Sequence, residues 1–352
     1  MRRIGKWMLP AAMLAMTWSC SPTQGRQQDD GPIAADDGRM CVGDKPRGVY
    51  YWKTVLSLND RERELVEQHG IARMYVRFFD VDEREEYDGS IAPVPVATTK
   101  FETAVPQGVE VVPVVFITNE TMRTASHFAP QMYARIQAMA RGNKLGEIKE
   151  IQLDCDWTET TRPQFFDLCR QVCQLAHKDS ITVSATIRLH QLATAAPPVD
   201  RGVLMLYNTG NMRSRKTQNS ILHQEDVAAY VKHGIDYALP LALAFPTYEW
   251  GLVFNSYGFS RIVRHAEVEN KEKFDALGKG RYVACSDQKI EDCWIRRRDT
   301  IRWETSDMKE IDAVKDMVLK GMKSKVDGMV IYHLDAANWA KYNDKEIERI
   351  LE

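Results

Sequence analysis

Eight short apolar runs, most of them followed by a helical pattern, constrain the fold of this 352-residue chain more than any other feature. Each run is nearly continuous, which is typical of parallel strands buried on both faces. Strand–helix alternation over eight such strands predicts an α/β fold, a (β/α)8 TIM barrel. A doubly wound open sheet is the alternative, but no glycine-rich phosphate loop follows the first run. The runs span residues 48–56, 71–79, 109–117, 148–156, 181–189, 202–207, 237–245 and 326–334.

The segment between the seventh and eighth runs is too long for a plain loop. It holds several aromatic residues, among them Trp250, Phe254, Tyr257 and Trp294. We therefore expect an inserted subdomain at about 247–307, on the active face of a barrel that occupies residues 46–352.

The N-terminus has the pattern of an export signal. Arg2, Arg3 and Lys6 precede an apolar run over 7–18 that is too short to span a membrane but typical of a signal peptide. Ser19-Cys20 after this run resembles the cleavage box of bacterial lipoproteins, which predicts a signal peptide over 1–20 and lipidation of Cys20. A plain secretory signal is the alternative. Residues 21–45 are expected to form a disordered tether.

These features predict an exported, membrane-anchored lipoprotein in the periplasm or on the cell surface, with the outer membrane favoured. An oxidising location lets cysteines pair, and Cys285 and Cys293, which flank a polar loop, are the best candidates for a disulfide. The formal charge of −2, with acids and bases spread along the chain, gives no reason to expect a nucleic-acid partner. No Cys-x-x-Cys or His-x-x-x-His pattern occurs, and we expect no metal and no other cofactor.

The fourth apolar run ends in a cluster of carboxylates. Side chains alternate between the two faces of a strand, so Asp154, Asp156 and Thr158 share one face while Cys155 and Trp157 share the other. Two carboxylates on one face of a buried strand cost desolvation and mutual repulsion, which favours a functional role. In a parallel barrel the C-terminal strand ends carry the active site. The alternative is a solvated strand end that caps the next helix.

Polar and aromatic residues also stand at the ends of the other predicted strands. Planar aromatic side chains pack on apolar faces of sugar rings, and carboxylates supply the acid, base or nucleophile of glycoside cleavage. A metal-dependent hydrolase is the competing use of such residues, but their spacing is not that of a metal-ligand set. The predicted substrate-binding residues are Trp52, Arg77, Tyr207, Asn208, Tyr248, Trp250 and Asp335, and the catalytic candidates are Asp156, Glu159 and Asp154.

Three short motifs resemble those of glycoside hydrolase family 18, the group of chitinases and endo-N-acetylglucosaminidases. Residues 151–157 (IQLDCDW) are similar to the family's Asp-Gly-x-Asp-x-Asp-Trp-Glu on strand four. Residues 205–208 (MLYN) are similar to its Met-x-Tyr-Asp on strand six, and 328–335 (GMVIYHLD) to its Gly-x-x-x-Trp-x-x-Asp on strand eight. The layout also resembles an uncharacterised family of exported bacterial barrel lipoproteins, through 49–52 (VYYW) and 239–248 (LPLALAFPTY). This second resemblance implies no activity.

The family-18 resemblance implies substrate-assisted cleavage, in which the N-acetyl group of the sugar takes part. Asp156 and Tyr207 match the residues that orient this group. The family's proton donor is a Glu two positions after the last Asp, where this chain has Thr158. Glu159 follows one residue late and would face away from the barrel mouth unless the strand twists or bulges. Other acids that could supply the proton are Glu120, Glu249 and Asp335.

We therefore predict an exported glycoside hydrolase that acts on an oligo- or polysaccharide, with the strand-four carboxylates in its active site. Two alternatives stay open: a degenerate hydrolase barrel that binds glycan without cutting it, which Thr158 favours, and a structural surface lipoprotein. The predicted partners are a carbohydrate and, through the lipid anchor, a membrane.

Overall fold

The structure is a computed structural model that describes residues 45–124 and 127–352. The predicted signal peptide, the lipidation site Cys20 and the tether, apart from Lys45, lie outside the described residues. Within those two ranges, no helix combines the length and the apolar character that a membrane span requires.

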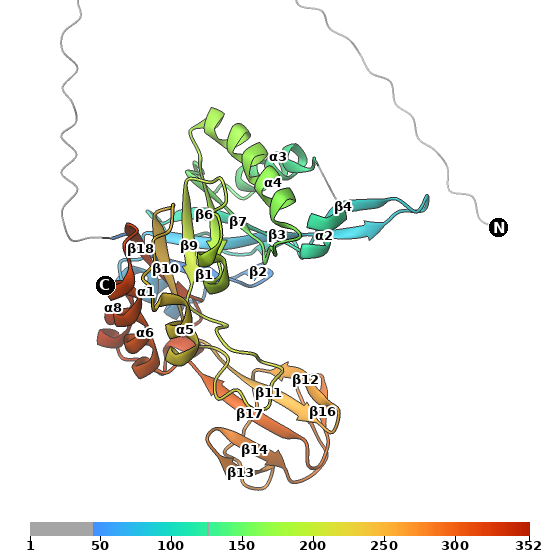
Figure 1. Ribbon diagram of the computed structural model, residues 1–352. Coiled ribbons are helices and arrows are strands. Elements are labelled where there is room, and N and C mark those ends of the chain that lie inside the picture. The colour runs from blue at the N-terminus through green and yellow to red at the C-terminus, as the bar shows by residue number, and fades with distance from the viewer. Residues whose placement is uncertain (1–44, 125–126) are drawn as a thin grey trace, which may run out of the picture. The chain divides into compact units, whose positions relative to one another are not determined.

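Eight parallel strands close into a barrel in chain order (Figure 1). Strand β1 pairs with both β3 and β18, which completes the ring. Each strand overlaps one of the eight apolar runs, so the predicted α/β barrel is confirmed. The strands are β1 (Arg47–Tyr51), β3 (Arg73–Glu85), β6 (Glu110–Ile117), β7 (Glu150–Asp154), β8 (Thr182–Ile187), β9 (Arg201–Met205), β10 (Leu241–Pro246) and β18 (Val326–Tyr332).

Helices follow most of the strands. Local sequence sets where they begin: Asn59 forms a capping box with Glu62 at the first helix, and Pro163 lies in the first turn of α4. The longer helices are α1 (Asp60–Gln68), α3 (Ala129–Gly142), α4 (Arg162–Ala176), α5 (Gln224–Val231), α6 (Met308–Gly321) and α8 (Asp344–Leu351). The short ones are α2 (Asn119–Thr124) and α7 (Ala336–Trp339), with 3-10 turns η1 (His177–Asp179) and η2 (Leu189–Ala193).

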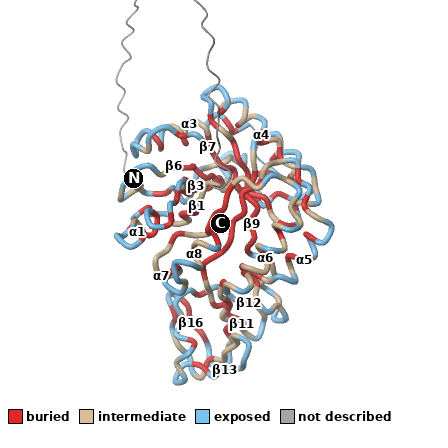
Figure 2. The backbone as a smooth tube through the Cα atoms, turned by 90° about the vertical axis from the view of Figure 1, so that its left-hand side faces the viewer, coloured by how far each residue is buried: buried red, intermediate tan, exposed pale blue. Residues whose placement is uncertain are grey.

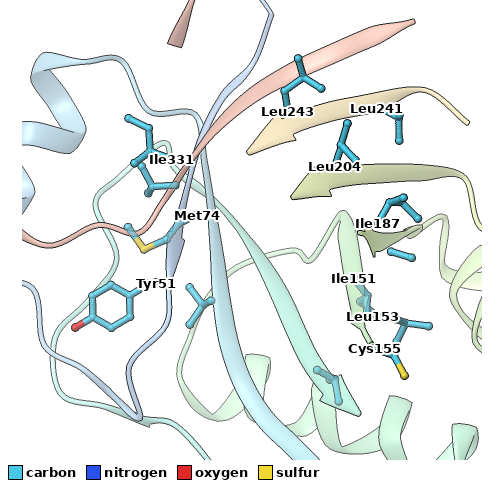
Figure 3. Close-up of a cluster of buried hydrophobic side chains, with 14 of the residues drawn as sticks. Tyr51, Met74, Ile151, Leu153, Cys155, Ile187, Leu204, Leu241, Leu243 and Ile331 are labelled. Carbon is cyan, nitrogen blue, oxygen red and sulfur yellow. The ribbon is translucent and has the colours of Figure 1, made fainter. Parts of the chain in front are cut away.

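The apolar core has two parts, one on each face of the barrel wall. The larger part packs between the strands and the helices. It contains Ile151 and Leu153 of β7 and also Cys155, the residue that follows β7 (Figure 3). The smaller part fills the barrel interior and includes Tyr50 and Tyr75. In Figure 2 the buried stretches follow the barrel strands. Alternating side chains along β1, β3, β6, β9, β10 and β18 therefore serve two different cores, whereas β7 and β8 contribute apolar residues only to the larger one.

Two regions depart from a plain strand–helix repeat near β3, the second strand of the barrel. Strand β3 continues six residues past the predicted end at 79 and pairs antiparallel with β4 (Ile91–Val96), forming a long hairpin (Figure 1). Short strands β2 (Val55–Leu56) and β5 (Lys100–Phe101) also pair, in parallel. A hairpin thus takes the place of a helix between β3 and β6.

Between β10 and α6 the chain forms a five-stranded antiparallel sheet in the order β12-β11-β17-β14-β13. The sheet has an apolar core of its own, which contains Val253, Val263 and Ile301. Its strands are β11 (Glu249–Asn255), β12 (Gly258–Val263), β13 (Phe274–Gly278), β14 (Arg281–Ala284) and β17 (Thr300–Thr305). Between β14 and β17 in the sequence, β15 (Gln288–Ile290) and β16 (Cys293–Ile295) form a separate antiparallel pair.

The predicted Cys285–Cys293 disulfide is wrong, because both thiols are free. Cys293 is buried in the apolar core of the sheet, whereas Cys285 is partly exposed. The two side chains therefore have different surroundings and do not meet.

Candidate functional site

Strand β7 presents its polar side chains to the barrel interior. The hydroxyl of Tyr50 donates to Gln152 Oε1 (2.6 Å), and Gln152 Nε2 donates to Ser184 Oγ (3.3 Å). Asp154, two residues further, is 3% exposed and accepts a hydrogen bond from the hydroxyl of Thr186 (2.6 Å). The predicted alternation along this strand is therefore present, with carboxylates on the face opposite Cys155.

Arg188, just after β8, joins the two predicted catalytic aspartates. Its Nη2 lies 3.5 Å from Asp154 Oδ1, and its Nε donates to Asp156 Oδ1. Asp154 is buried and Asp156 is half exposed. One guanidinium therefore serves two carboxylates at the end of the same strand.

Burial and charge act in opposite directions on this cluster. Burial raises the pKa of Asp154, the positive charge of Arg188 opposes that rise, and the negative charge of Asp156 adds to it. Burial alone would lower the pKa of Arg188, but the two aspartates raise it above its ordinary range. The guanidinium stays charged, and the buried carboxyl has the greater tendency to hold a proton.

Glu159, the third catalytic candidate, does not join this cluster. Its side chain is 64% exposed and pairs with Arg162 (3.0 Å) at the start of α4. Thr158, at the family-18 proton-donor position, bonds locally with the hydroxyls of Thr160 (2.9 Å) and Thr161 (3.3 Å). The chain turns into α4 here, and no carboxylate follows Asp156 on the inward face of the strand.

A pocket of about 460 Å³ opens beside the ends of β1, β10 and β18. Tyr332 stacks on Tyr207, with ring centroids 4.5 Å apart, and the ring of Trp52 lies 6.1 Å from that of Tyr332. Five of the seven predicted binding residues line the pocket: Trp52, Asn208, Tyr248, Trp250 and Asp335. Other lining residues are Lys53, Glu249, Arg264, His265, Tyr332, His333, Ala337 and Asn338.

The carboxylates that line this pocket are each paired with a cation. Asp335 lies 3.0 Å from Lys53 Nζ and caps α7 through its Oδ1, and Glu249 lies 3.6 Å from Lys341 Nζ. Burial tends to raise the pKa of Asp335, but the hydrogen bond from Lys53 and the backbone N–H of Asn338 outweigh it and lower the pKa. Asp335 is therefore ionised at neutral pH.

Neutral polar groups complete the lining. The hydroxyl of Tyr248 donates to Asn208 Oδ1 (2.7 Å), and Trp250 Nε1 donates to buried Glu304 (2.7 Å). Burial lowers the pKa of His333 to about 4, and its Nδ1 has no hydrogen-bond partner among the described residues. A neutral imidazole and two fixed aromatic rings thus face the same space.

The two remaining predicted binding residues support the pocket from behind its lining. Arg77 pairs with Asp80 (2.8 Å) and places its guanidinium 5.7 Å from the ring centre of Trp52. Tyr207 is buried under the stack with Tyr332, and its hydroxyl has no partner within the described part of the chain. Both residues hold the aromatic rings in place.

Arg188 and Tyr332 are not among the predicted catalytic or binding residues, although both stand at the ends of predicted strands. Ser184, Thr186 and Arg188 alternate along the fifth predicted strand, which was a signal that Arg188 points inward. The ring of Tyr332 lies 5.6 Å from that of Tyr50, whose hydroxyl donates to Gln152 of β7, so the pocket lies close to the inward face of that strand. Tyr332 stands where the family-18 motif has Trp.

Comparison with known proteins identifies relatives by structure alone. No protein-family model matches the sequence, and no curated protein matches it. The C-terminal domain of a predicted chitinase from Desulfitobacterium hafniense is similar, with a TM-score of 0.51 and 10% identity over 88% of this chain and 99% of that one. A spore cortex-lytic enzyme, SleL, from Bacillus megaterium has a TM-score of 0.49 and 12% identity over 88% and 75% of the two chains. A GH18 chitinase variant from Cycas revoluta, solved with (GlcNAc)4, has a TM-score of 0.49 and 9% identity over 87% and 98%.

At these identities the similarity shows the fold. This chain has a glycoside hydrolase-like (β/α)8 barrel of the chitinase type, and the predicted resemblance to family-18 barrels is confirmed at that level. The resemblance to exported lipoproteins and the roles of individual site residues stay predictions.

Proposed function

We propose that this protein binds a glycan in the pocket at the barrel mouth and does not cleave it by the family-18 route. The observation that carries this proposal is that no carboxylate occupies the position of the family-18 proton donor. Thr158 occupies it, and the neighbouring carboxylate of Glu159 is exposed and paired with Arg162 (3.0 Å).

The pocket lining supports a sugar ligand. The rings of Trp52, Tyr248, Trp250 and Tyr332 supply apolar faces for pyranose rings. Charged and neutral polar groups beside them, such as Asp335, can orient hydroxyl groups. The volume of about 460 Å³ falls within the range of about 300–1,000 Å³ that is typical of small-ligand sites.

The ion pair of Asp335 opposes general-acid catalysis by this residue. Its carboxyl group lies 3.0 Å from Lys53 Nζ, and the hydrogen bond from Lys53 helps to lower the pKa of Asp335 despite its burial. An ionised carboxylate cannot donate the proton that the leaving oxygen of a glycoside needs.

Hydrolysis is a second candidate function because of one observation. Burial raises the pKa of Asp154 while its neighbour Asp156 is half exposed. A carboxyl group whose pKa is raised by burial, next to a second carboxyl group, is a candidate general acid of a hydrolase.

One experiment separates the two functions. The protein expressed from residue 21 is titrated calorimetrically with neutral oligosaccharides, including chitin oligomers, and the same mixtures are examined for products by mass spectrometry. We expect binding without product release, and at least a tenfold loss of affinity in Trp52→Ala. Tyr87→Ala, a fully exposed aromatic on the hairpin, is the matched control.

Products that disappear in Asp154→Asn would replace the binding proposal with hydrolysis. Failure of every oligosaccharide to bind, or full affinity in Trp52→Ala, would show that the pocket is not a glycan site.

We also infer, from the sequence of the N-terminus, that the chain is exported and anchored to a membrane by a lipid on Cys20. Metabolic labelling with a fatty acid should mark the wild-type chain and not Cys20→Ser. Equal labelling of both chains would contradict the anchor.

A further inference from the structure

The inserted sheet carries a second pocket, of about 640 Å³, that the proposed function does not use. It is bounded by the β11–β12 turn, by β12, by β16 and by the loop that leads to β17, and the loop after β9 adds Arg215. We call it the arginine pocket. Its lining contains five arginines and a single acid; these are Arg215, Arg261, Arg296, Arg297, Arg298 and Asp299.

The positive charge of this pocket is largely unneutralised. Arg296 pairs with Asp287 (2.9 Å), but the other four lining arginines form no ion pair with any residue of 45–124 or 127–352. Like charges gathered in a concave surface repel one another and concentrate a positive potential there. The whole chain has a formal charge of −2, so this potential is a local feature and not the consequence of a basic protein.

Exposed aromatic rings stand among these arginines. Tyr257 is 97% exposed and Trp294 is 60% exposed, and both line the pocket. The guanidinium of Arg296 lies 5.9 Å from the centre of the Trp294 ring, which orients both groups. Large aromatic side chains left in water beside unpaired cations are typical of a binding surface.

The arginine pocket and the pocket at the barrel mouth adjoin the same strand. Arg261 of β12 lines the arginine pocket, while Arg264 and His265, just after β12, line the barrel-mouth pocket. Three residues of extended chain span about 10 Å. A polymer of sugar rings is therefore long enough to reach both sites.

We propose that the arginine pocket binds an acidic polysaccharide, so that the glycan of this protein carries carboxylate or sulfate groups. The planar guanidinium binds either group with two parallel hydrogen bonds, and the exposed rings of Tyr257 and Trp294 stack on the pyranose units between the anionic groups. The choice of a sugar polymer rests on the proposed function of the barrel mouth. The need for anionic groups rests on the five arginines alone.

The test measures binding of defined polymers to the protein expressed from residue 21. Polygalacturonate supplies carboxylates, heparin supplies sulfates, a chitin oligomer is neutral, and poly(dT) represents nucleic acid. We expect at least one acidic polysaccharide to bind with an affinity that falls as salt rises. Whichever of polygalacturonate and heparin binds more tightly identifies the preferred anionic group, carboxylate or sulfate.

The decisive variant is Arg261→Gln/Arg297→Gln, which removes two exposed arginines that form no ion pair among the described residues. We expect its affinity for the acidic polysaccharide to fall at least tenfold, and that of Trp294→Ala to fall as well. Arg61→Gln/Arg170→Gln makes the same change of charge on two exposed helix positions and should bind as the wild type does. Unchanged circular dichroism shows that each variant is folded.

The outcomes keep this inference separate from the proposed function. Full affinity in the decisive variant, or equal losses in the control, overturns the inference even if the barrel mouth binds a neutral oligosaccharide. Tighter binding of poly(dT) through the same arginines overturns it in favour of a nucleic acid. Loss of acidic-polysaccharide binding in the decisive variant, with Trp52→Ala unaffected for every polymer, supports the inference and defeats the proposed function.

Discussion

Arg188 determines the charge state of the barrel mouth at the scale of single residues. It contacts Asp154 at 3.5 Å and donates to Asp156, so a cation lies beside both of the predicted catalytic aspartates. Burial still raises the pKa of Asp154, and Arg188 limits that rise, so the cation weakens this carboxyl group as a proton donor without excluding it. None of these three residues lines the pocket at the barrel mouth, so we expect their contacts to act on the stability of the barrel.

Replacing Arg188 should destabilise the protein. In Arg188→Gln, buried Asp154 loses its cation, and we expect the free energy of unfolding to fall by about 3 kcal/mol, the lower end of the range for a broken buried ion pair, because Asp156 is half exposed. Urea denaturation measures the change. Arg188→Gln/Asp154→Asn removes the stranded charge and should recover part of the loss. A double variant no more stable than the single one would contradict this account.

His333 should make the stability depend on pH. Burial lowers its pKa to about 4 in the folded protein, against about 6.5 for an exposed imidazole. Between these values the unfolded chain binds a proton that the folded one does not, so stability is lost as the pH falls from about 6.5 to about 4. The shift corresponds to roughly 3 kcal/mol.

Thermal unfolding of the wild type and of His333→Asn, measured between about pH 6.5 and about pH 4, tests whether His333 causes this loss of stability. The difference in stability between them should change with pH, because the variant lacks the titrating group. Nearby Asp335 and Lys53 remain in both proteins and cancel in the comparison. Parallel curves would contradict a buried neutral His333.

At the scale of elements, β7 has a separate task on each face. Inward side chains build the Arg188 cluster, while Trp157, just past the strand, packs against α4 with ring centroids 5.5 Å from Phe166 and 6.4 Å from Phe165. Because one short strand segment supports both the site and a helix, small shifts of α4 reach the carboxylates.

Removing the Trp157 ring should therefore cost stability. Trp157 is 1% exposed, and Trp157→Ala leaves a cavity between β7 and α4, for which we expect a loss of about 3–5 kcal/mol in chemical denaturation. Trp294→Ala, which removes the same ring from a position 60% exposed, is the matched control and should change stability little. Similar losses in both variants would show that the Trp157 contact with α4 is not a core contact.

At the scale of the whole molecule, buried polar contacts join the inserted sheet to the loop after β9. Glu304 accepts from Ser220 Oγ (2.6 Å), and Arg302 pairs with Glu304 (2.6 Å) and donates to the backbone oxygen of Ser214 (2.6 Å). The described residues, 45–124 and 127–352, accordingly belong to one compact unit. Opening the sheet alone would break these hydrogen bonds, so the two parts should open together.

Hydrogen exchange tests this cooperativity. The slowest amides of β11 and β17 should exchange with the same free energy of opening as those of β7, because opening the sheet alone would break the contacts of Glu304 with Ser220 and of Arg302 with Ser214. Glu304→Gln, which weakens the junction, should let the sheet exchange earlier than the barrel. A sheet that already exchanges independently in the wild type would contradict the coupling.

The sequence by itself determined the features that depend on neighbouring residues. Period-two alternation placed Asp154 opposite Cys155, apolar runs located the eight strands, and Asn59 and Pro163 marked helix starts, because side-chain direction and capping are local properties. The displaced position of Glu159 was predictable for the same reason. Hairpin β3–β4 was missed, since pairing partners cannot be read from one strand.

Only the tertiary structure decided which of these groups meet. Arg188 reaches Asp156 from 32 residues away, and the arginines of the inserted sheet come from separate turns and loops. Such contacts exist because closing the barrel and folding the sheet bring distant strand ends together, and no local pattern encodes that distance. The sequence located a row of carboxylates; the closed barrel supplied the cation that changes their chemistry.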